Sequence, residues 1–302
     1  MNPNPVRSIR IGTLVDGTSS DPANYIEQIL PHGFESFQLT FGSAVNNLDL
    51  PALADRILAV LDGSNAVISS LGVYGNPLLD SKEALATRES WSQLIRHADA
   101  FGAGVIGGFT GRIINRPIPE SIPKFTEVFA PIVDQAGELG LKIGFENCSM
   151  GGDWNTGDWN IAHGPDAWEL MFDALPDDHV GLEWEPCHQM INLIEPLPQL
   201  RTWVQKIFHI HGKCATINTD TIREIGIRGS KIFAYHRTPG FGDTDWTDIF
   251  TELRAGEFKG SVDIEGWHDP VYRDELEMTG QVFALNYLKQ CRGGEFRPNP
   301  EP

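Results

Sequence analysis

Three glutamates and one histidine stand at the ends of short apolar runs that have the composition of β-strands. They are Glu146, Glu185, His211 and Glu265. If the strands form a closed parallel barrel, their carboxyl ends meet at one mouth, where three carboxylates would repel one another without a cation between them. Carboxylate oxygens and an imidazole nitrogen suit divalent metals, so the pattern predicts a metal site. Mn²⁺ is the first candidate, with Mg²⁺, Co²⁺ and Zn²⁺ as alternatives.

Each of three further polar residues precedes one of these ligands by two positions. Side chains two apart on a strand share a face, so Glu183, His209 and Asp263 are expected one layer deeper in the barrel. There they would orient the ligands and fix the tautomer of His211. For His209, a hydrogen-bonded core histidine is an equally good interpretation.

The predicted site suits proton abstraction next to a carbonyl group. A dication chelated by neighbouring carbonyl and hydroxyl oxygens acidifies that carbon by stabilising an enediolate. Glu146 and Glu265 are the expected acid and base, with His188 as a further acid, base or hydroxyl-binding group. A helix-start residue with a surface role is the alternative for His188. The ligands carry about −3 and a dication leaves roughly −1, which favours a neutral sugar or keto-sugar over a sugar phosphate.

Eight strand-like segments alternate with helix-like segments, which predicts one (β/α)₈ barrel over residues 1–302 with a loosely ordered tail at 292–302. An open doubly wound sheet is the rival, but the turn after the first strand lacks its Gly-x-Gly-x-x-Gly fingerprint. The expected strands are Ser8–Val15, Glu35–Phe41, Ala66–Val73, Gly104–Phe109, Lys142–Glu146, Val180–Glu185, Ile207–His211 and Gly260–Glu265. The expected helices are Pro22–Pro31, Leu50–Leu61, Ser81–Phe101, Ile122–Leu139, Pro165–Leu175, Leu197–Lys206, Trp246–Leu253 and Arg273–Leu288.

Two connections, 147–164 and 212–245, are too long for simple turns and are expected at the barrel mouth. The first contains Trp154 and Trp159 among glycines and asparagines, a composition that suits sugar binding because flat rings stack on C–H faces. A packed cover over the barrel is the alternative. Lys213 and Arg237, within the second connection, are further candidate substrate contacts, and the site would attract a phosphate strongly only if one of them supplied positive charge.

The bulk composition is that of a soluble globular protein, with 41% hydrophobic residues in 302 and a formal net charge of −18. This charge disfavours nucleic acid and anionic membranes as partners. The sequence shows no long apolar span and no secretion signal at its start, so we expect a cytoplasmic protein. The four cysteines form no C-x-x-C pair; a thiolate zinc site is an alternative to small residues that line a reduced pocket.

At these residues the chain resembles the xylose isomerase-like barrel family of sugar isomerases and epimerases. The likeness spans nearly the whole chain and is strongest from Gly144 to Pro270. It is carried in order by Phe145-Glu-Asn, Gly181-Leu-Glu-Trp-Glu-Pro-Cys-His, His209-Ile-His-Gly-Lys, Arg237-Thr-Pro-Gly-Phe-Gly and Asp263-Ile-Glu-Gly. The resemblance implies the metal ligands named above, Glu146 and Glu265 as the acid/base pair, and a substrate-facing His188 and Arg237. The family usually has Asp at the position of Glu185, and Asp at that of Cys214.

One branch of this family contains lyases and hydratases of 3-keto-glycosides, some of which split C-glycosides. The run Glu146-Asn-Cys-Ser-Met, the tryptophan-bearing loop and Glu265-Gly-Trp-His-Asp-Pro are similar to that branch, which implies a substrate contact at Trp267. We therefore expect a sugar isomerase or epimerase, with a metal-dependent lyase as the alternative. A non-catalytic sugar-binding subunit also stays open, whereas the charge argues against a related endonuclease. A homo-oligomer or a hetero-complex with a small subunit is possible in each case.

Overall fold

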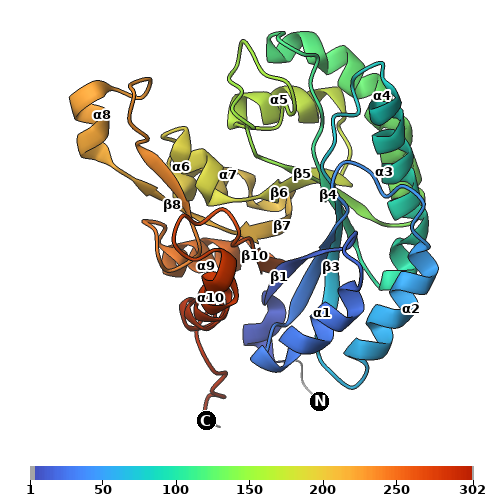
Figure 1. Ribbon diagram of the computed structural model, residues 1–302, viewed down its shortest axis with the longest axis vertical. Helices are drawn as coiled ribbons and strands as arrows, with labels where there is room; N and C mark the ends of the chain where they lie inside the picture. Colours follow the sequence, from blue (N-terminus) through green and yellow to red (C-terminus); the bar gives the residue numbers. More distant parts are fainter. Residues whose placement is uncertain (1–3, 301–302) are drawn as a thin grey trace.

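A computed structural model describes residues 4–300 of the chain. Eight parallel strands close into a barrel in the order β1-β10-β7-β6-β5-β4-β3-β2, and helices surround them (Figure 1). This confirms the predicted (β/α)₈ barrel. The barrel strands are β1 (Arg10–Asp16), β2 (Ser36–Thr40), β3 (Val67–Val73), β4 (Val105–Gly108), β5 (Lys142–Glu146), β6 (Val180–Trp184), β7 (Ile207–Gly212) and β10 (Ser261–Ile264).

Several of the helices begin where the sequence supplies a capping side chain. Asp21, Asp49, Ser81 and Asp245 each accept a hydrogen bond from a backbone N–H of the first turn, which satisfies donors that the helix leaves unpaired. The helices are α1 (Pro22–Ile29), α2 (Leu50–Leu61), α3 (Lys82–Phe101), α4 (Ile118–Glu138), α5 (Pro165–Ala174), α6 (Pro186–Ile191), α7 (Pro196–Trp203), α8 (Thr219–Ile225), α9 (Trp246–Ala255) and α10 (Glu277–Cys291). Short 3₁₀ turns span Pro5–Ser8, Leu30–His32, Val204–Lys206 and Asp274–Leu276.

Two helices follow β6, where the sequence predicted one. Instead of a single helix over Leu197–Lys206, α6 starts directly after Glu185 and α7 follows it. A proline at the first helical position of each explains both starts, since that position needs no N–H donor. His188 therefore lies within α6, near the end of β6.

The connection after β7 forms an arm. Its strands β8 (Cys214–Ile217) and β9 (Ala234–Arg237) pair antiparallel, with α8 between them. Figure 1 shows α8 standing away from the ring of helices. Because Cys214 pairs with Arg237, the base of the arm returns to the barrel mouth next to Lys213.

Side-chain alternation on β5 separates the apolar core from the site. The Phe145 ring packs against Trp91 of α3 and Phe129 of α4, with centroids 6.0 and 4.9 Å away. Because Phe145 faces the helices, Glu146 must face the barrel interior. That interior is unusually polar for a barrel core, since it holds the fully buried side chains of Ser36, Gln38, Glu183 and Asp263.

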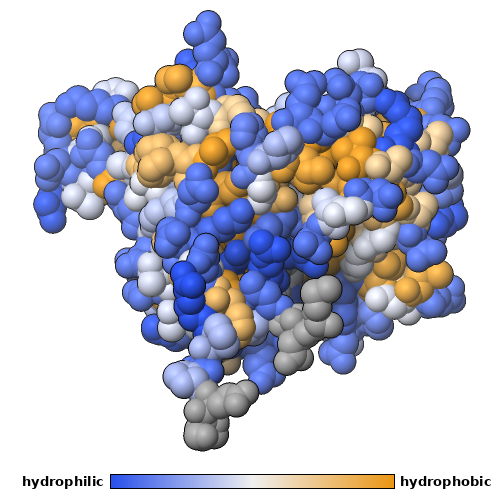
Figure 2. All heavy atoms as spheres, turned by 90° about the horizontal axis from the view of Figure 1, so that it is seen from below, coloured by the Kyte–Doolittle hydropathy of each residue, from blue (hydrophilic) through white to orange (hydrophobic). Residues whose placement is uncertain are grey.

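The start of the predicted tail is fixed to the barrel. Arg292 is buried, and its Nη1 donates to the carbonyl oxygen of Ile9 at 2.7 Å and to Glu35. Residues 301 and 302 of the predicted tail 292–302 lie outside the described residues. Hydrophilic residues cover most of the face seen in Figure 2, with hydrophobic residues gathered in a band. Among residues 4–300, no helix is long and apolar enough to cross a membrane.

Candidate metal centre and substrate pocket

The structure brings the four predicted metal ligands together. One ligand atom from each of Glu146, Glu185, His211 and Glu265 lies within 4.8 Å of the others, and all four residues are buried. Glu146 ends β5 and His211 lies near the end of β7, whereas Glu185 and Glu265 directly follow β6 and β10. The convergence thus follows from the shared direction of the barrel strands.

Asn147 holds two of these strand ends in register. Its side-chain amide donates to the carbonyl oxygen of Glu185 at 2.8 Å, and its side-chain oxygen accepts from the backbone N–H of Glu185 at 2.7 Å. Asn160 also fixes the backbone after β5, because its side-chain amide donates to the carbonyl oxygens of Glu146 and Cys148. The Glu-Asn pair of the sequence therefore supplies one candidate ligand, Glu146, and the residue that fixes the backbone of another, Glu185.

Gln38 sets the tautomer of His211. The Gln38 amide nitrogen lies 2.9 Å from the Tyr74 hydroxyl and 2.5 Å from Oε1 of Glu183, so it acts as the donor there. Gln38 Oε1 must then accept the hydrogen bond from Nε2 of His211, at 2.8 Å. Burial disfavours the charged ring, but the surrounding glutamates outweigh it and raise the pKa of His211 well above its ordinary value. A divalent cation would replace the proton on Nδ1, while Gln38 keeps the other proton on Nε2.

The unpaired atoms of this cluster fit a divalent cation. Within residues 4–300, both carboxylate oxygens of Glu185, Oε2 of Glu265 and Nδ1 of His211 are buried without a hydrogen-bond partner. Each such atom costs about 1–3 kcal/mol when left unsatisfied. His211 Nδ1 lies 3.2 Å from Oε2 of Glu265 and 3.7 Å from Oε1 of Glu146. Oxygen and imidazole donors of this kind are those that Mn²⁺, Mg²⁺, Co²⁺ and Zn²⁺ take.

Lys213 adds a positive charge inside the cluster. Its Nζ lies 2.7 Å from Oε1 of Glu265 and 3.7 Å from Oε2 of Glu185. Burial works against the ammonium, but the Glu265 charge outweighs it and raises the pKa of Lys213 above its ordinary value. Burial also opposes the Glu265 carboxylate, and Lys213 then holds the pKa of Glu265 well below its usual range.

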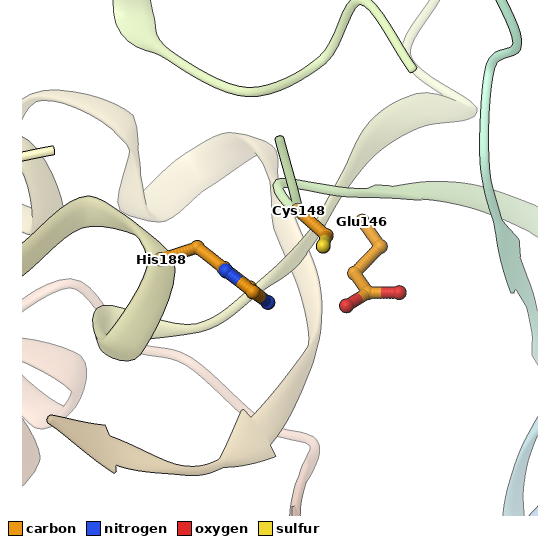
Figure 3. Close-up of side chains that lie close together, drawn as sticks. All are labelled: Glu146, Cys148 and His188. Atoms are coloured by element: carbon orange, nitrogen blue, oxygen red, sulfur yellow. The ribbon is translucent and has the colours of Figure 1, made fainter. Parts of the chain in front are cut away.

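Glu146, Cys148 and His188 face one another at the edge of the cluster (Figure 3). His188 Nε2 lies 2.6 Å from Oε1 of Glu185, although their alignment is not that of a hydrogen bond. Burial and Lys213 hold the pKa of His188 well below its ordinary value, so the ring is neutral. Burial and Glu146 raise the pKa of Cys148 to about 12, which keeps the thiol protonated in the absence of a metal.

A cavity of about 640 Å³ opens above these residues. Of the predicted substrate contacts, His188, Lys213, Trp159 and Trp267 line it. Trp154 and Arg237 are not among its lining residues in the described chain. The Nε of Arg237 instead lies 3.0 Å from Oδ2 of Asp269. Tyr74, His236 and His268 also line the cavity, although no pattern in the sequence marks them.

The residues of the deeper polar layer contact one another. His209 Nε2 lies 2.8 Å from Oδ2 of Asp263, and its Nδ1 lies 2.9 Å from Oε1 of Glu183. Asp263 also accepts from the Ser36 hydroxyl. The three predicted residues thus contact one another, while Gln38 makes the hydrogen bond to His211.

A (β/α)₈ barrel with buried acids at the carboxyl ends of its strands has the architecture of a TIM-barrel protein. The family model of the xylose isomerase-like TIM barrel matches residues 26–287, and the chain therefore belongs to that family.

Solved sugar epimerases share the fold. The 3-keto-D-glucoside 4-epimerase from E. coli is 14% identical, with a TM-score of 0.69 and coverage of 94% of this chain and 100% of that chain. An L-ribulose 3-epimerase is 14% identical, with a TM-score of 0.67 and coverage of 93% and 92%. A D-psicose 3-epimerase is 16% identical, with a TM-score of 0.66 and coverage of 95% and 100%.

A curated relative is the inosose dehydratase of Lactiplantibacillus plantarum. It is 25% identical over 114 residues. The match spans 37% of this chain and 37% of that protein, so the chain matches only about a third of the relative's length.

Proposed function

We propose that the chain is a divalent-cation-dependent isomerase or epimerase that acts on a sugar or keto-sugar. The observation that carries the proposal is the set of four ligand atoms within 4.8 Å of one another at the floor of a 640 Å³ cavity. The fold shared with three sugar epimerases supports the same class of substrate.

Glu146, Glu185, His211 and Glu265 would hold the cation. A bound dication supplies Lewis acidity, which makes a C–H next to a carbonyl group easier to ionise. The barrel order β10-β7-β6-β5 puts Glu265 and Glu146 on the two sides of Glu185 and His211. One carboxylate can therefore remove a proton on one side of the substrate while the other returns a proton from the opposite side.

The remaining residues bind and orient the sugar. The neutral His188 ring can donate to or accept from a hydroxyl, and Trp159 and Trp267 offer flat surfaces for C–H faces. Three carboxylates, the Lys213 ammonium and a dication add up to a site of about zero net charge. Such a site favours an uncharged sugar.

Exchange of a carbon-bound proton tests the proposal. The protein, loaded with Mn²⁺, is incubated in D₂O with a panel of ketoses and 3-keto-glucosides, and the sugars are analysed by NMR and mass spectrometry. We expect deuterium at the carbon next to the carbonyl. We also expect an epimer or isomer whose mass differs from that of the starting sugar only by the deuterium taken up. A folded, metal-loaded protein that exchanges no proton in any of these sugars would refute it.

A lyase or dehydratase is the second candidate, favoured by the similarity to inosose dehydratase. Both reactions begin with proton removal next to a carbonyl, and they differ in whether a neighbouring group then leaves. The same experiment separates them, because elimination releases water or an aglycone and an epimerase releases neither.

A further inference from the structure

A second cavity, of about 400 Å³, adjoins the substrate pocket. Leu14 and Trp267 line both cavities, so these two side chains form the boundary between them. The second cavity runs between the start of α1, which contributes Tyr25, and Glu277 at the start of α10. Burial raises the pKa of Tyr25, and the charge of Glu277 raises it further. We call this second cavity the α1–α10 groove.

The combined volume of the substrate pocket and the α1–α10 groove exceeds the volume of one sugar ring. Even at the roughly 30 Å³ that a water molecule occupies in the liquid, the twelve heavy atoms of a hexose fill no more than about 360 Å³. The substrate pocket alone measures about 640 Å³, and the groove adds about 400 Å³ at its edge. A ligand with one ring over the ligand cluster can therefore extend past Trp267 into the groove.

The groove has the surface chemistry of a carbohydrate site. Ser19, Asn24 and Gln28 line it with exposed hydroxyl and amide groups, which can both donate to and accept from sugar hydroxyls. The Trp267 side chain at the boundary is 44% exposed and offers an apolar surface to the C–H face of a ring.

Charge narrows the class of ligand. The groove contains the acidic residues Asp16, Asp21 and Glu277 and no lysine or arginine among its lining residues in the described chain. Phosphate and carboxylate groups would be repelled there, whereas an uncharged sugar ring would not.

We propose that the α1–α10 groove is a second subsite, which binds an uncharged sugar ring of a glycoside whose other ring occupies the substrate pocket. The assignment of the reacting ring to the substrate pocket rests on the proposed function. Recognition of the second ring does not require any reaction, so it can be measured by binding alone.

Binding of unreactive sugars to the Mn²⁺-loaded protein tests the subsite. The probes are D-glucose and the glucobioses cellobiose, maltose, trehalose and gentiobiose, measured by isothermal titration calorimetry. We expect at least one glucobiose to bind about tenfold or more tightly than glucose, since two or three added hydrogen bonds supply a gain of that order. For that scaffold the 6-phosphate ester on the second ring should bind more weakly than the neutral sugar.

A matched pair of variants tests whether the gain in affinity for the glucobiose comes from the α1–α10 groove. The double variant Asn24→Ala, Gln28→Ala should lose most of the preference for the glucobiose over glucose. Glu27→Ala, on the same helix but outside the lining of the groove, should keep that preference. A panel in which no glucobiose binds more tightly than glucose, or a preference that the double variant retains, overturns the subsite. Proton exchange with monosaccharides is measured separately, so failure of the subsite and failure of the proposed function give different results.

Discussion

Replacement of Gln38 tests how the structure prepares His211 to bind a cation. Gln38→Leu keeps the size of the side chain but removes the oxygen that accepts the hydrogen bond from Nε2 of His211. The proton can then move to Nδ1, the atom that faces Glu265 and Glu146. Loss of such an orienting partner typically lowers metal affinity 10- to 100-fold, or by about 1.4–2.7 kcal/mol.

Calorimetric titration of Mn²⁺ into the metal-free protein measures this loss directly, without reference to any substrate. Ser70→Ala serves as the matched control, because Ser70 is also buried next to Gln38 but has no hydrogen bond to His211. The control should bind Mn²⁺ as the wild type does. If the folded Gln38→Leu protein binds Mn²⁺ with unchanged affinity, Gln38 does not select the tautomer and the reasoning fails.

Three other perturbations have defined outcomes. Glu265→Gln should abolish proton exchange and leave the circular dichroism spectrum unchanged, because this side chain lies at the barrel mouth and not in the apolar core. Removal of Mn²⁺ by a chelator should lower the melting temperature, since a cation about a thousandfold above its dissociation constant adds roughly 4 kcal/mol to the free energy of unfolding; an unchanged melting temperature would count against the site. Glu35→Gln should cost about 3 kcal/mol of unfolding free energy near neutral pH. Burial opposes the Glu35 carboxylate, but Arg292 holds its pKa below the ordinary value of 4.5, so this contribution is complete above about pH 5 and declines as the pH falls through the lowered pKa. Denaturant titrations from pH 7 to pH 3 should therefore show wild type and variant converge in acid, and a gap of constant size would contradict the role of Arg292.

The convergence of the four candidate ligands was predictable because parallel strands impose a simple rule. Each of these side chains ends an apolar run: Glu146, Glu185, His211 and Glu265. Because the carboxyl ends of all barrel strands lie at the same mouth, residues that are far apart in the sequence come close together there. Alternation then fixes which way each side chain points, as Phe145 and Glu146 demonstrate on β5. Local pattern and global topology agree at these positions.

Gln38 and Arg237 mark the limit of such inference. Gln38 bonds to His211 across 173 positions of sequence, and nothing in its own strand segment distinguishes it from a polar residue facing solvent. Arg237 lies in a motif expected to face the substrate, but Asp269 from a separate loop engages its guanidinium. Pairings between distant polar side chains depend on the three-dimensional positions of both partners, which hydrophobic periodicity does not encode.

The arm between β7 and α9 has a practical consequence for engineering. Its paired strands pack against α6 and reach the barrel mouth at their base, where Cys214 is opposite Arg237, while residues 226–230 lie at the far end next to α8. Foreign sequence inserted at 226–230, such as a fluorescent reporter or an affinity tag, would leave the spacing of the acids at the barrel mouth unaltered. The fold thus contains a natural attachment point at the end of the arm, next to the helix that stands away from the ring of helices.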